Sequence, residues 1–170
     1  MKILITYSSK TGNTKKVAEA IATVVEGADI LDIKENPNFD DYDAVIVGYW
    51  ADRGKADPLA DKFLPNIKDK VCGVFATLGA YPDSDHAKDI INYGKNLLEE
   101  NGNKVISTFI CQGKIDPALT ERFKDLPKDH PHYMDEARRK RHEEAAKHPD
   151  EKDLENAKTA FKDFVKELGA

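Results

Sequence analysis

Short runs of apolar residues alternate with longer amphipathic stretches along most of the chain. Each run is rich in β-branched residues and ends at small or polar residues, which is typical of strands buried on both faces of a parallel sheet. The pattern predicts five such strands, at residues 3–7, 30–33, 44–48, 71–78 and 105–111.

Apolar residues at helical spacing follow most of these runs. The second and third strands have no clear helix between them, so we expect a short or irregular connection there. Alternating strands and helices imply a parallel sheet covered on both faces. The predicted fold is therefore α/β, a doubly wound five-stranded sheet of order 2-1-3-4-5. Helices are expected at residues 13–25, 57–64, 87–98 and 154–168, the last with one continuous apolar stripe.

The segment at about 114–149 breaks this alternation. It is polar, and we interpret it as a surface insertion in a single domain of residues 1–170, with one helix at about 134–147. Its histidines match no compact zinc pattern and no cysteine joins them, so a solvated face is favoured and no metal site is predicted. The insertion carries four of the five histidines, His130, His132, His142 and His148.

Composition narrows the possible partners. The net charge is −5, and the only dense basic run is residues 138–141, which argues against a nucleic-acid partner. No apolar stretch approaches the length of a membrane span, so no membrane partner is predicted. Cys72 and Cys111 both fall in predicted strands. Buried, reduced thiols are expected there, which indicates a cytoplasmic protein.

A polar loop, residues 8–14, joins the first strand to the first helix. A helix N-terminus at the carboxyl edge of a parallel sheet is a favourable site for an anion. Hydroxyl groups, the Asn13 amide and backbone N–H groups can surround one phosphate, and Gly12 permits close approach. The loop lacks the G-x-G-x-x-G spacing of a dinucleotide-binding fold and the Gly-Lys-Ser/Thr ending of a P-loop. A ligand with a single phosphate therefore fits it better. The simpler alternative is a polar turn that only caps the helix.

The run Ser9-Lys10-Thr11-Gly12-Asn13-Thr14 matches the pattern [ST]-x-T-G-x-T, placed directly after an N-terminal strand. It resembles the phosphate loop of the flavodoxin family, which implies flavin mononucleotide (FMN) as cofactor and this loop as its phosphate site. The similarity covers residues 1–111 and the last helix, whereas the insertion departs from short-chain flavodoxins.

The resemblance also implies where the flavin ring lies. Flavodoxins hold it between the loops that follow the third and fourth strands, often against aromatic rings. Trp50 and Tyr81 stand at the corresponding positions as the ring-stacking pair, and Gln112 is placed to reach the pyrimidine side of the ring. The remaining predicted contacts are Tyr49, Ala51, Asp52, Arg53 and Gly54 in the first loop and Leu78, Gly79 and Ala80 in the second.

Two functions remain open. The first is an electron carrier that docks to a partner oxidoreductase. The second is an FMN-dependent reductase of a quinone-like or conjugated organic substrate. Flavodoxins are strongly acidic, whereas this chain has a pI of about 5.6 and carries Arg53 and Lys55 in the ring-side loop. We therefore expect a less negative flavin potential than in acidic flavodoxins. Three runs further resemble a flavodoxin subgroup of gut and other anaerobic bacteria, including one associated with a bilirubin-reducing enzyme. They are Tyr49–Gly54, Leu78–Pro82 and Cys111–Asp116.

Overall fold

The computed structural model describes the whole chain, residues 1–170. Its central sheet has five parallel strands in the order β2-β1-β3-β5-β6, and this confirms the predicted order 2-1-3-4-5. An additional short strand, β4, pairs antiparallel with the end of β3. The strands are β1 (Ile3–Tyr7), β2 (Asp29–Asp32), β3 (Ala44–Asp52), β4 (Lys55–Ala56), β5 (Val71–Leu78) and β6 (Lys104–Gln112).

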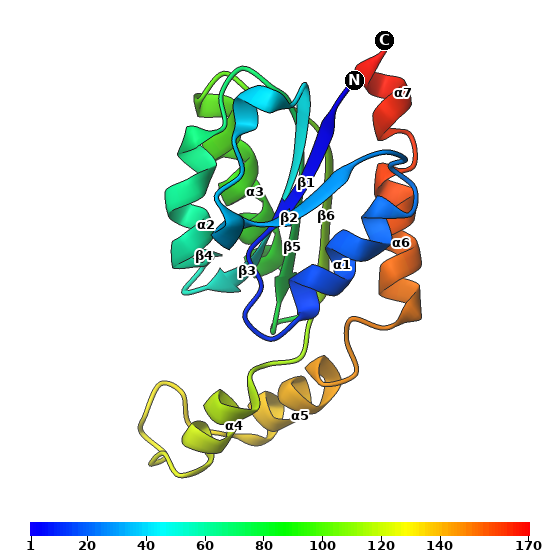
Figure 1. Ribbon diagram of the computed structural model, residues 1–170. Coiled ribbons are helices and arrows are strands. Elements are labelled where there is room, and N and C mark those ends of the chain that lie inside the picture. Colours follow the sequence, from blue (N-terminus) through cyan, green and yellow to red (C-terminus); the bar gives the residue numbers. More distant parts are fainter.

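Helices cover both faces of the sheet (Figure 1). The helices α1 (Asn13–Ala22) and α6 (Glu151–Phe161) lie on one face. The helices α2 (Pro58–Phe63) and α3 (Asp85–Glu100) lie on the other. Right-handed crossovers between parallel strands produce this two-sided layering. No helix of the chain combines the length and the apolar character that crossing a membrane requires.

Alternation along the strands divides the apolar core in two. Ile5 and Ile46 contribute to the cluster under α1 and α6, whereas Leu4 and Val45 contribute to the cluster under α2 and α3. All four side chains are fully buried. Because neighbouring strand residues point to opposite faces, a strand buried on both sides is apolar at every position, as these runs are.

The connection between β2 and β3 is irregular, as expected, with two short 3-10 turns, η1 (Ile33–Glu35) and η2 (Phe39–Asp41). The last helix differs from the prediction. It is interrupted after Phe161, and a separate short helix, α7, spans Phe164–Leu168. Both flanking phenylalanine rings are buried, and a side chain at Gly73 of β5 would collide with the first of them. The interruption lets both rings pack on this face of the sheet.

The insertion contains two helices rather than one. Besides α5 (Glu136–Ala145), a helix α4 spans Pro117–Lys124 and was not predicted. Asp116 caps α4 and Pro117 follows it, so the same Asp-Pro signal that starts α2 was available in the sequence. Both helices lie beyond the carboxyl edge of the sheet, next to the N-terminus of α1 (Figure 1).

The insertion histidines do not form a single solvated face, and this expectation was wrong. His142 is buried and shares a 2.9 Å hydrogen bond with Thr120. The ring of His132 stacks on Phe123, with ring centroids 4.9 Å apart. The first contact joins α4 to α5, and the second joins α4 to the segment between the two helices.

Candidate functional site

The loop between β1 and α1 opens toward solvent at the carboxyl edge of the sheet. Gly12 adopts a left-handed backbone conformation with φ of 96°. A side chain at this position would meet no atom within 4 Å, so the space above the loop is open. A residue with a Cβ is strained at this φ, which is why glycine stands at this turn.

Several backbone N–H groups of the loop face no protein acceptor. The hydroxyl of Ser9 accepts hydrogen bonds from the N–H groups of Gly12, at 3.2 Å, and Lys15, at 3.3 Å. The N–H groups of Thr11 and Asn13 take part in none of the hydrogen bonds within the chain. Unpaired N–H groups at a helix N-terminus are the donors that an anion requires.

The predicted phosphate-loop side chains divide into two groups. Those of Lys10 and Thr11 are exposed, and that of Asn13 is half-buried. The Thr14 hydroxyl instead points inward and shares a buried 3.0 Å hydrogen bond with Thr77 of β5. Thr14 thus anchors the first turn of α1 to the sheet.

Trp50 lies within β3 rather than in a loop. The strand continues to Asp52, and β4 pairs back onto it through a two-residue turn of Arg53 and Gly54. The φ angles of these two residues are 52° and 83°, the two positive values that tight hairpin turns prefer. Trp50 is half-buried opposite Thr77 of β5. The predicted loop is therefore a hairpin that holds Trp50, Ala51 and Asp52 in strand conformation.

The side chain of Tyr49 faces the core instead of this edge. Its hydroxyl donates a 2.6 Å hydrogen bond to the Ile90 carbonyl and accepts one from the Gly94 N–H at 3.1 Å. Burial raises the pKa of Tyr49, so the hydroxyl stays protonated. Only the backbone of Tyr49 is thus available to a ligand at the edge.

The second predicted loop follows β5. Leu78 is buried at the strand end, Gly79 and Ala80 are half-buried, and Tyr81 has 44% of its surface exposed. Gln112, itself buried, donates a 3.1 Å hydrogen bond from Nε2 to the Gly79 carbonyl. Gln112 thereby fixes the loop that carries the exposed tyrosine ring.

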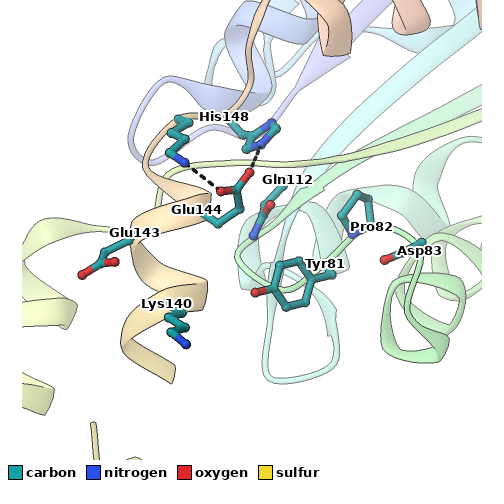
Figure 2. Close-up of a pocket in the computed structure, with 9 residues that line it drawn as sticks. Tyr81, Pro82, Asp83, Gln112, Lys140, Glu143, Glu144 and His148 are labelled. Carbon is teal, nitrogen blue, oxygen red and sulfur yellow. Dashed lines mark hydrogen bonds and ion pairs between the residues drawn. The ribbon is translucent and has the colours of Figure 1, made fainter. Parts of the chain in front are cut away.

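The insertion supplies one wall of a cleft at this loop (Figure 2). The cleft has a volume of about 710 Å³ and lies between the loop of Tyr81 and helix α5. Nothing in the sequence pattern pointed to these insertion residues, because their position depends on how α5 packs against the domain. From the insertion and its end come Lys140, Glu143, Glu144, Lys147 and His148, which face Tyr81, Pro82, Asp83 and Gln112.

Potential metal ligands come together at one point, the start of α6. One ligand atom each of His148, Asp150 and Asp153 lies within 4.8 Å of the others. Nδ1 of His148 and the Asp153 carboxylate already share a hydrogen bond of 2.5 Å. The same carboxylate accepts from the Asp150 N–H at 2.9 Å. This cluster is therefore satisfied by its own hydrogen bonds.

A doubly wound sheet with unpaired N–H groups at a helix N-terminus on its carboxyl edge is typical of nucleotide-binding α/β domains. Residues 4–162 match the family described as the flavodoxin domain, and the chain belongs to this family. It is 35% identical over 173 residues to the flavodoxin-like domain-containing protein BilS of Clostridioides difficile, covering 97% of each chain.

Solved structures agree on the fold. Oxidised flavodoxin 2 from Bacillus cereus superposes with a TM-score of 0.65 at 19% identity, covering 98% of this chain and 99% of the other. A flavodoxin from Fusobacterium nucleatum bound to flavin mononucleotide gives a TM-score of 0.53 at 16% identity, covering 68% of this chain and 79% of the other.

Proposed function

We propose that the protein binds one FMN and passes electrons to or from a partner oxidoreductase. The observation that carries this proposal is the loop of residues 9–14, with unpaired N–H groups and open space above Gly12. Membership of the flavodoxin domain family and the likeness to a flavodoxin that binds this cofactor support it. When bound, the flavin supplies the redox chemistry, and the protein sets its potential.

The residues present fit such a cofactor. The unpaired N–H groups of Thr11 and Asn13 would hold the phosphate, helped by the partial positive charge of the α1 N-terminus. Trp50 and Tyr81 would contact the ring, since both lie at the same sheet edge with part of their surface accessible. The two buried free cysteines, Cys72 and Cys111, accord with the reducing cytoplasm that we propose as its location.

A titration of the apoprotein with FMN tests the cofactor assignment. Trp50 is the only tryptophan, so contact with the ring should quench its fluorescence. Riboflavin, which lacks the phosphate, is the matched control ligand. We expect FMN to bind at least about a hundredfold more tightly, because several charge-assisted hydrogen bonds of roughly 1.5–3 kcal/mol each are lost with the phosphate. Equal affinities would contradict a phosphate-binding loop.

Electron transfer is tested separately, with the FMN-loaded protein reduced anaerobically and mixed with an oxidised acceptor protein. Reoxidation of the flavin together with reduction of the acceptor is the expected result. The cleft beside Tyr81 favours a second candidate, an FMN-dependent reductase of a conjugated organic substrate, because it offers space next to the proposed ring position. Turnover of such a substrate with NAD(P)H as sole reductant would select the second candidate.

A further inference from the structure

Lys10 links three segments of the proposed flavin site. Its backbone belongs to the loop between β1 and α1, and its Nζ lies 5.8 Å from the centroid of the Trp50 ring. The same Nζ lies 3.3 Å from Oδ2 of Asp116, at the start of the insertion. The Lys10 side chain is 60% exposed, so the ion pair itself contributes little to folding.

Asp116 is held in place by its role as the cap of α4. Its Oδ1 accepts a 3.0 Å hydrogen bond from the Ala118 N–H, and Pro117 stands at the first helical position. This hydrogen bond, and after it the ammonium group of Lys10, lower the pKa of Asp116 below its ordinary value. The carboxylate is therefore ionised at neutral pH, with its second oxygen directed to Lys10.

The backbone just before Asp116 is also fixed. The Lys114 carbonyl accepts a 2.8 Å hydrogen bond from the Asn13 side chain, and the Lys114 N–H donates one of 2.9 Å to the His148 carbonyl. The next residue, Ile115, packs on Gly79, where an added Cβ would lie 2.6 Å from its Cγ1. The start of the insertion thus contacts both the loop between β1 and α1 and the loop that follows β5.

The cations expected from the sequence are placed differently. Lys55 forms a 2.7 Å ion pair with Asp61 and lies over the ring of Tyr93, on the side of α3. Arg53 is exposed at the tip of the hairpin. Lys10 is the cation that lies against the ring of Trp50.

We propose that Lys10 stabilises the reduced flavin and that Asp116 of the insertion weakens this effect. The inference rests on the proposed FMN function. Two electrons from a partner oxidoreductase and one proton from solvent convert the neutral oxidised ring into an anion with one negative charge. A nearby ammonium group favours that anion, and a nearby carboxylate disfavours it. The insertion would thereby contribute a charge of its own to the redox site.

Measurement of the two-electron midpoint potential of the FMN-loaded full chain tests this proposal. In Lys10→Met we expect the ratio of reduced to oxidised flavin affinity to fall about fivefold, by loss of one charge interaction in a water-like medium. That change is a shift of ~20 mV toward more negative potential for a two-electron couple. Lys10→Arg should retain the wild-type potential. Asp116→Asn keeps a capping side chain but loses the charge, and it should shift the potential in the opposite direction.

Lys55→Met is the matched control, because it removes a lysine that is likewise paired with an aspartate but lies over the ring of Tyr93 instead of Trp50. Its potential should equal that of the wild type. An unchanged potential in Lys10→Met, an equal shift in Lys55→Met, or shifts of the same sign in Lys10→Met and Asp116→Asn would overturn the proposal. If the wild-type chain bound no FMN, the proposed function itself would fail, which is a different result from binding with an unaltered potential.

Discussion

The hydroxyl of Ser8 donates a 2.6 Å hydrogen bond to the Asp57 carboxylate, and both side chains are buried. The carboxylate also accepts from the N–H groups of Trp50 and Ala60, each at 3.3 Å. One acidic side chain therefore joins the end of β1, the strand that carries the single tryptophan, and the N-terminus of α2. Burial raises the pKa of Asp57, and these hydrogen bonds oppose the rise.

Replacement of Asp57 should destabilise the fold strongly. Asp57→Ala leaves the Ser8 hydroxyl and the Ala60 N–H without their acceptor, and we expect the free energy of unfolding to fall by about 2–4 kcal/mol. Ser8→Ala removes only one donor and should cost about 1 kcal/mol. Urea denaturation at pH 7 measures both. A cost below that of Ser8→Ala would show that Asp57 is not the central acceptor.

The fold could be predicted because its central strands, β1, β3 and β5, are buried along most of their length on both faces of the sheet. A run such as Val71–Leu78 is apolar at nearly every position, and its bounds in the structure are those predicted. The end of β3 could not be predicted in the same way, since Ala51 and Asp52 are held in the strand by their pairing with Lys55–Ala56. The turn between Asp52 and Lys55 begins with Arg53, at a position where hairpin turns usually have Asn, Asp or Gly. The usual sequence signal of a hairpin was therefore missing.

Gly12 and Gly27 allow a test that separates backbone strain from ligand binding. Both have positive φ, 96° and 77°, and a Cβ added at either residue would meet no atom within 4 Å. Alanine at either site should lower the free energy of unfolding by roughly 1 kcal/mol through the same strain. FMN affinity, measured by titration, should weaken at least about tenfold only in Gly12→Ala, because only that substitution disturbs the loop's N–H donors. Equal affinities in both variants would place the phosphate elsewhere.

Tyr49→Phe should lower the stability of the fold without weakening FMN binding. The substitution leaves the Gly94 N–H and the Ile90 carbonyl without the hydroxyl, and we expect a loss of about 1–2 kcal/mol in the free energy of unfolding. FMN affinity should stay within about twofold of wild type, because the Tyr49 ring lies in the core under α3 and the lost bonds are local to it. A large loss of affinity with unchanged stability would instead indicate that Tyr49 contacts the flavin through its side chain.

The candidate site could be predicted only where its parts are local in sequence. The loop of residues 9–14 is one continuous hexapeptide, so its pattern was visible. The contacts of Lys10 with Asp116 and of Asn13 with Lys114 each join residues about a hundred positions apart. They depend on how the insertion returns to the sheet edge, and hydrophobic periodicity carries no information about that path.

His148 closes the insertion at its far end. Its backbone carbonyl accepts from the Lys114 N–H at the near end, at 2.9 Å. Its ring lies between two carboxylates, with Nδ1 at 2.5 Å from Asp153 of α6 and Nε2 at 3.3 Å from Glu144 of α5. Asp150 lies 3.8 Å from Nδ1. Lys147, the other charged group nearby, is paired with Glu144.

Protonation of His148 should therefore strengthen the attachment of α5. Burial lowers the pKa of His148, but the hydrogen bonds to Asp153 and Glu144 outweigh it and raise the pKa above the ordinary 6.5. A raised pKa in the folded state means that this stabilisation is complete below pH 6.5 and is lost as the pH rises through the folded value. We expect protection of the α5 amides from hydrogen exchange, corrected for intrinsic rates, to decrease across that range relative to α3. His148→Gln should abolish the decrease, whereas His86→Gln, at an exposed position, should retain it. The effect should be below about 1 kcal/mol for a partly exposed ion pair, and protection that rises with pH would contradict the assignment.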